Sequence, residues 1–186
     1  MPLLILHGLD GNEPDHWQTW LAEQAAAAGI EVRYPQLPSP ATPRRDAWCD
    51  AVLPLLPADL DPELDVVAHS LGCDLWGHLA RRTRHAVARR VLLVAPPSPS
   101  LVARDIPTFD PAPPSRDLLD CCPDTKLLLG SDDPWLPDPG RMLDCGLPAE
   151  RVQGGAHLNV ESGYGPWPAM LRWAQGADVP SDGWGR

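Results

Sequence analysis

The chain has 186 residues, a hydrophobic fraction of 44% and a net charge of −10, from 25 acidic and 15 basic residues. This length and composition indicate one globular domain with a full core, and the acidic balance argues against a nucleic-acid-binding protein, which needs clustered Lys and Arg. No stretch approaches the roughly 20 apolar residues of a membrane-spanning helix, so the sequence also argues against a membrane protein.

The N-terminus and the cysteines indicate a cytoplasmic protein. Met1-Pro2 leads directly into an apolar run that is too short for a signal peptide and lacks a basic region before it. The five cysteines are an odd set without the spacing of metal ligands, and we expect them to be reduced thiols. They are Cys49, Cys73, Cys121, Cys122 and Cys145.

Short apolar runs alternate with helix-like segments along the whole chain. In chain order, strands are predicted at residues 3–6, 32–34, 64–68, 91–95, 126–129 and, more weakly, 151–153, and helices at 17–25, 42–56, 71–84 and 166–175. Thr42 followed by Pro43 is typical of an N-cap with proline in the first turn, so the second helix is expected to begin there.

This alternation predicts an α/β fold in which a parallel sheet of about six strands has helices on both faces. Residues 1–175 are expected to form one domain, followed by a polar tail at 176–186 that is weakly ordered unless Trp184 holds it in place. The segment 96–114 contains seven prolines and no clear periodicity. It is too short for a lid domain, and we expect a loop that carries function or moves.

The pentapeptide Ala68-His69-Ser70-Leu71-Gly72 stands where a predicted strand ends and a helix begins. A serine between small residues at such a corner is typical of a nucleophile elbow, although a serine at this place also serves as an ordinary helix N-cap. An acid and a base follow further along the chain, in Asp132-Asp133 and in His157. The order Ser, Asp, His is that of the α/β-hydrolases and favours catalysis.

Several motifs together resemble those of one protein family. They are His7-Gly8 with Gly11-Asn12, His16-Trp17, the pentapeptide at 68–72, Asp132-Asp133-Pro134, Gly155-Ala156-His157-Leu158-Asn159, and Ser162-Gly163-Tyr164-Gly165-Pro166-Trp167-Pro168. Over residues 3–173 the chain resembles the RBBP9/YdeN family of small serine hydrolases, and its bacterial branch in particular. The resemblance implies an α/β-hydrolase fold without a lid domain, with Ser70 as nucleophile, Asp133 as acid and His157 as base.

The register of the acid loop favours Asp133 over its neighbour. Asp133 lies three residues after Gly130 and four before Pro137, which is where such loops carry the acid, so Asp132 would be a loop or helix-cap carboxylate. Two backbone amides should stabilise the oxyanion, one from Leu71 and the other from Leu9. No metal or organic cofactor is needed for this chemistry.

Other side chains near these motifs have alternative roles. Trp135 and Trp167 lie beside the acid and base loops and either line an acyl pocket or pack at the edge of the core. His69 and His7 are expected to be structural, and His16 to open the first helix.

The sequence therefore predicts a serine hydrolase that cleaves a small soluble ester, thioester or amide. The alternative is a hydrolase-fold interaction module with vestigial activity, whose protein partner the sequence does not identify.

Overall fold

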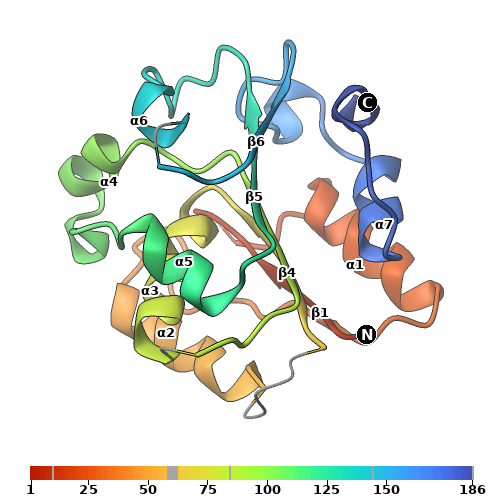
Figure 1. Cartoon of the computed structure of the whole chain (residues 1–186), viewed down its shortest axis with the longest axis horizontal. Coiled ribbons are helices and arrows are strands. Elements are labelled where there is room, and N and C mark those ends of the chain that lie inside the picture. Colours follow the sequence, from red (N-terminus) through yellow and green to blue (C-terminus); the bar gives the residue numbers. More distant parts are fainter. Residues whose placement is uncertain (10, 58–62, 84, 144, 186) are drawn as a thin grey trace.

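A six-stranded parallel sheet runs through the centre of the molecule (Figure 1). The computed structural model describes residues 1–9, 11–57, 63–83, 85–143 and 145–185. The strands lie in the order β2-β1-β3-β4-β5-β6. Their bounds are β1 Leu3–Leu6, β2 Val32–Arg33, β3 Asp65–His69, β4 Arg90–Val94, β5 Thr125–Gly130 and β6 Ala149–Val152. The predicted parallel sheet is thus confirmed, and the order reverses between β1 and β3, where such sheets bind ligands.

Helices cover both faces of the sheet (Figure 1). One face carries α1 Trp17–Ala27 and α7 Pro168–Ala174, and the other carries α2 Arg45–Val52, α3 Leu71–Thr83, α4 Pro99–Asp105, α5 Ser115–Cys121 and α6 Gly140–Leu143. Short 3₁₀ turns complete the fold: η1 Leu53–Leu55, η2 Pro107–Phe109, η3 Val160–Ser162 and η4 Ser181–Trp184. The predicted end of the third helix, Arg84, lies outside the described residues.

Two hydrophobic clusters hold these layers together. Along β1, Leu3 and Ile5 face the cluster under α1 and α7, whereas Leu4 and Leu6 face the larger cluster under α2, α3 and α5. All four side chains are at most 1% exposed. A strand buried on both faces reads as an unbroken apolar run, which explains why this strand could be predicted from sequence.

The second helix begins later than predicted. Residues 39–42 form a turn in which the Thr42 amide donates to the Ser39 carbonyl at 2.9 Å, and the N-cap is Arg44, with α2 starting at Arg45. The regular helix ends at Val52, because Pro54 has no N–H to donate and the chain tightens into η1. The prediction for 42–56 was therefore wrong at both ends.

The proline-rich segment also differs from the prediction, because it contains a helix. Pro99 lies in the first turn of α4, where a backbone N–H would have no helical partner, and so it begins the helix instead of breaking it. Within 96–114, the residues before and after α4 are irregular, apart from the short turn η2.

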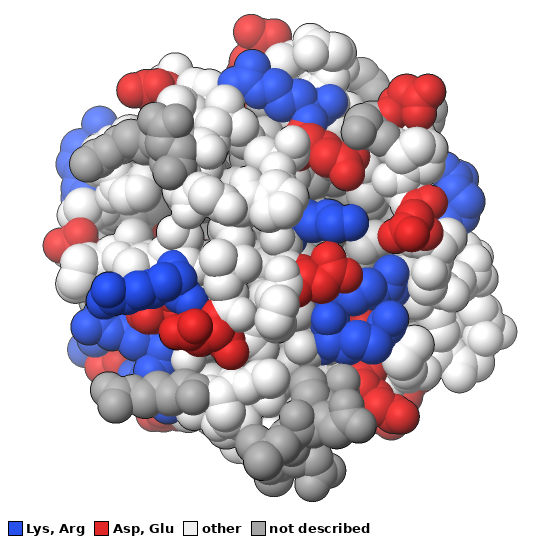
Figure 2. Space-filling model, in the orientation of Figure 1, with Lys and Arg blue, Asp and Glu red and all other residues white. Residues whose placement is uncertain are grey.

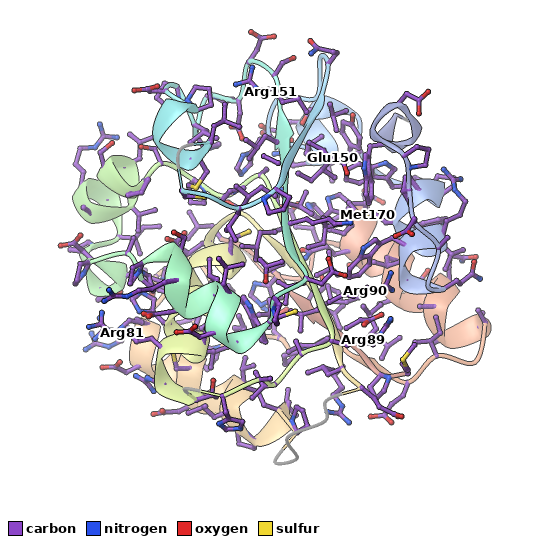
Figure 3. The ribbon with its side chains drawn as sticks, viewed as in Figure 1. Arg81, Arg89, Arg90, Glu150, Arg151 and Met170 are labelled. Atoms are coloured by element: carbon purple, nitrogen blue, oxygen red, sulfur yellow. The ribbon has the colours of Figure 1, made fainter. Side chains whose placement is uncertain are left out.

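A buried ion-pair network ties the sheet to α7. The Arg90 guanidinium lies 4.6 Å above the centre of the Trp173 ring and donates to the Asp65 carboxylate at 2.7 Å and to the Trp173 carbonyl at 2.8 Å. Arg89 also donates to Asp65. Figure 3 shows both arginines where the chain enters β4. Both arginines are thus paired with a carboxylate inside the protein.

The C-terminal residues pack against the edge of the sheet. Trp184 is 3% exposed, and its indole N–H donates to the carboxylate of Glu150 on β6 at 2.6 Å. Figure 3 labels Glu150 at this edge. The Trp184 carbonyl in turn accepts the indole N–H of Trp167 at 3.0 Å.

The surface in Figure 2 carries Lys and Arg side chains interspersed with Asp and Glu, and neither sign forms a continuous field. None of the helices within the described residues has the length and apolar character needed to cross a membrane.

Candidate active site

Ser70 is the single residue between the end of β3 and the start of α3, where the chain turns sharply. Its φ of +53° is in the left-handed region, which a serine adopts only when its surroundings hold it there. Its amide donates to the Val94 carbonyl at 3.0 Å. This strained turn presents the hydroxyl above the carboxyl ends of the strands, as a nucleophile elbow does.

Two glycines make room for this corner. A Cβ on Gly72 would lie 2.6 Å from the Leu6 carbonyl oxygen, and one on Gly8 would lie 2.9 Å from the Cβ of Ser70. Both distances are too short for any side chain, so α3 and the turn after β1 can approach each other only with glycine at these positions.

His157 and Asp133 complete a hydrogen-bonded chain with the serine. His157 Nε2 lies 2.9 Å from Ser70 Oγ, and His157 Nδ1 lies 2.9 Å from Asp133 Oδ2 and 3.0 Å from Oδ1. Asp133 is 5% exposed and His157 is 7% exposed. With its Nδ1–H donating to the carboxylate, the neutral imidazole leaves Nε2 free to accept the hydroxyl proton.

The structure brings Asp133, and not Asp132, to the imidazole. Asp132 has a φ of +63° at the tip of the loop after β5, and its side chain is exposed. The chain then turns so that Asp133 is buried, and Asp133 Oδ1 also accepts the Trp135 amide at 2.8 Å. This backbone bond fixes the orientation of the carboxylate toward His157.

Two further histidines lie in a row beside the base, with their rings tilted to one another. The ring centres of His16 and His69 are 4.9 Å apart, and those of His69 and His157 are 5.0 Å apart. His69 Nε2 donates to the backbone carbonyl of His157 at 2.9 Å, and His16 Nδ1 accepts the Gln18 amide as the N-cap of α1. His69 therefore holds the base loop, and His16 opens the first helix as expected.

Burial keeps both of these imidazoles neutral. It lowers the pKa of His16 to about 4, with the nearby imidazoles of His157 and His7 acting in the same direction. Burial, followed by the influence of His16 and His157, lowers the pKa of His69 well below its ordinary value. A histidine whose pKa is lowered gains its proton only at lower pH, so neither adds a positive charge beside His157 near neutrality.

We expect a single proton to govern the acid limb of the pH–rate profile. Above about pH 5 the rings of His16 and His69 are uncharged, so the logarithm of kcat/KM should rise with pH with a slope of one. The measurement is hydrolysis of p-nitrophenyl butyrate across this range. His16→Asn, which keeps an N-cap side chain, should leave that slope unchanged. A slope close to two would show that a second imidazole titrates.

An open cavity of about 890 Å³ extends from Ser70 and His157. Leu9, Leu71 and Trp135 line this cavity. Trp135 is 42% exposed at its edge. Trp167, the other predicted pocket residue, is fully buried and packs against Trp17 and Tyr164 in the core, so of the two alternatives it takes the core role.

Part of the cavity wall comes from the proline-rich segment at 96–114, for which the sequence predicted a functional or mobile loop but no individual residue roles. Leu101 and Val102 on α4, followed by Ile106 and Thr108, line this cavity. The only sequence signal for them was their place in a long proline-rich connection, which is typical of functional loops.

Comparisons with known proteins find relatives that cover most of the chain. YdeN of Bacillus subtilis (strain 168) is 27% identical over 186 aligned residues, covering 89% of this chain and 90% of that protein. The crystal structure of the ydeN gene product from B. subtilis superimposes with a TM-score of 0.78 at 20% identity, over 94% of this chain and 96% of that one.

An esterase matches part of the chain. The pimeloyl-[acyl-carrier protein] methyl ester esterase of Aromatoleum aromaticum is 41% identical over 107 residues, or 55% of this chain and 39% of that protein.

The match to YdeN confirms the resemblance seen in the sequence. The model of the family described as serine hydrolase matches residues 3–175. This chain belongs to the serine hydrolase family.

Proposed function

We propose that this serine hydrolase transfers the acyl group of a small, accessible ester or thioester, or of an amide, to water through a Ser70–His157–Asp133 triad. The observation that carries the proposal is the unbroken hydrogen-bonded chain from the buried carboxylate of Asp133 through both ring nitrogens of His157 to Ser70 Oγ. A hydroxyl is a weak nucleophile near neutral pH and needs such a base and an orienting acid.

The reaction proceeds in two acyl transfers. His157 Nε2 takes the Ser70 proton as Oγ attacks the carbonyl carbon, and it then returns that proton to the leaving alcohol, thiol or amine. Water enters, gives a proton to the same imidazole and attacks the acyl-enzyme, which releases the acid and restores Ser70. Asp133 holds the imidazole in its tautomer and stabilises the imidazolium.

The oxyanion hole is proposed to consist of the amides of Leu71 and Leu9. Leu71 is the first residue of α3, and amides in the first turn of a helix have no helical partner. Leu9 follows Gly8, which packs directly on Ser70, and both leucines line the cavity at the nucleophile. Each such donor is worth about 3 kcal/mol of transition-state stabilisation.

The cavity supports a small substrate with an apolar acyl group. Leu101, Val102 and Trp135 provide apolar surface within reach of the nucleophile, and the cavity is open to solvent. The relative named as a methyl ester esterase supports ester chemistry. An exposed cleft of this kind suits soluble esters better than aggregated lipid.

The proposal is tested by covalent labelling and by an ester panel. A fluorophosphonate probe should label the wild type and the matched control Ser98→Ala, whose hydroxyl lies outside the triad, but should not label Ser70→Ala. p-Nitrophenyl acetate, butyrate and octanoate then report the acyl length that the cavity accepts. An unlabelled wild type that hydrolyses none of these esters would favour the interaction module instead.

A further inference from the structure

A second cavity, of about 670 Å³, lies on the other side of the wall that bounds the active site. It is lined by α3, α5, α6 and the segment that leads into α4, and it shares no lining residue with the active-site cavity. Pro97 and Trp135 face the active site, whereas Ser98 and Leu136 face the second cavity. The Ser98 amide donates to the Trp135 carbonyl at 2.8 Å and joins the two parts of this wall.

Most of the surface of this second cavity is apolar. Its sides come from Leu118 on α5, Leu127 on β5, Met142 on α6, and Leu136 and Leu147 from the connections between them. Such a lining accommodates a hydrocarbon group and excludes a strongly hydrated one.

Asp74 on α3 is one of the polar residues in this lining, with Asp138, Ser98, Ser100 and Ser115. Its side chain is partly exposed and borders the cavity, although its Oδ2 atom is buried and has no hydrogen-bond partner among the described residues. No Lys or Arg lines the cavity in the part of the chain that the structure describes. Once ionised, this carboxylate has no counter-charge in the lining, and a cation that paired with it would offset the cost of its partly buried charge.

We propose that this cavity binds a small organic ammonium ion, whose alkyl part packs on the leucines and whose charge pairs with Asp74. An ammonium fits better than a metal ion, because the described residues contain no group of three or more His, Cys, Asp or Glu side chains that could hold a metal ion. The second carboxylate in the lining, Asp138, accepts the Gly140 amide at 3.1 Å and stabilises its own turn. The site does not involve Ser70 and stands independently of the proposed esterase activity.

The acidity of Asp74 gives the site a characteristic pH dependence. Burial raises the pKa of Asp74 to about 7, so its carboxyl group is largely protonated at pH 6 and largely ionised at pH 8. An alkylammonium keeps its charge over this range. Because it pairs with the ionised form, its affinity should rise about tenfold from pH 6 to pH 8.

The experiment is isothermal titration calorimetry of the full chain with n-pentylammonium chloride, 1-pentanol and sodium pentanoate. Pentylammonium should bind the wild type at pH 8, and both other probes should bind at least tenfold more weakly. Asp74→Asn, which keeps the size of the side chain, should weaken pentylammonium binding at least tenfold. The control Asp120→Asn, an exposed carboxylate of α5 outside this cavity, should leave it unchanged.

Three results would overturn the proposal. They are equal affinity for pentanol and pentylammonium, undiminished binding of pentylammonium to Asp74→Asn, and absence of binding of pentylammonium to the wild type at pH 8. The pH dependence needs only the wild type, so it tests the site even if Asp74→Asn does not fold. An affinity that stays constant between pH 6 and pH 8 would also contradict pairing with Asp74.

Discussion

Asp133→Asn is expected to lower kcat by about four orders of magnitude. The Trp135 amide donates to Asp133 Oδ1, so in the variant it should hold the carboxamide oxygen at that position. The carboxamide NH₂ then faces His157 Nδ1 in place of Oδ2 and can only donate. The imidazole would have to carry its proton on Nε2, where it can no longer accept the proton of Ser70.

Asp132→Asn provides the matched control. Asp132 is the adjacent carboxylate on the same loop, but its side chain is exposed. We therefore expect the kcat of Asp132→Asn to stay within about threefold of the wild-type value. Both variants should be assayed with the ester that the wild type hydrolyses fastest, and their folding checked by circular dichroism. A large loss in Asp132→Asn with little change in Asp133→Asn would move the catalytic acid to the neighbouring residue.

Gly130→Ala is expected to destabilise the fold by more than about 3 kcal/mol, which lowers Tm by at least roughly 6–12 °C for a chain of this size. A Cβ on Gly130 would lie 1.9 Å from the Ala156 carbonyl oxygen and 2.9 Å from its carbonyl carbon and its nitrogen. These are backbone atoms, so relief requires the segment before His157 to move. Activity should fall by about 10²-fold or more, because such a shift misplaces the base.

Gly154→Ala separates this close contact from the general cost of replacing a glycine. Gly154 has a φ of +66°, but nothing lies within 4 Å of the Cβ it would gain. Its alanine variant should therefore lose only about 1–2 kcal/mol from left-handed strain. Differential scanning calorimetry of both variants gives the comparison. If the two melt within a few degrees of each other, the packing of β5 on the base loop is looser than these distances indicate.

The strands and the order of the proposed triad could be predicted from sequence because both depend on local patterns. Buried parallel strands such as β3 and β4 appear as short apolar runs, and their carboxyl ends meet at one edge of the sheet. Candidate residues that follow different strands therefore had to come close together. The choice of Asp133 over Asp132 followed from its loop register, and it agrees with the observed geometry.

The features that sequence did not reveal depend on tertiary contacts. Thr42 has the residue type and the following proline of an N-cap, yet a competing turn to Ser39 is present and the N-cap of α2 is Arg44, two residues later. Whether Trp135 or Trp167 meets the cavity depends on which tryptophan the core encloses. The unpartnered carboxylate of Asp74 has no local signature at all, since an acidic residue in the first turn of a helix is commonplace.

The two edge strands of the sheet affect how readily this protein associates with other copies at high concentration. An edge strand exposes unpaired N–H and C=O groups that can template association with another copy, and long flat edges are the hazardous ones. Here β2 contributes only two residues, and β6 has four, with Trp184 tied to its Glu150 side chain. Both edges are therefore short, and the C-terminal turn packs beside the longer one, which limits the strand edge open to such association.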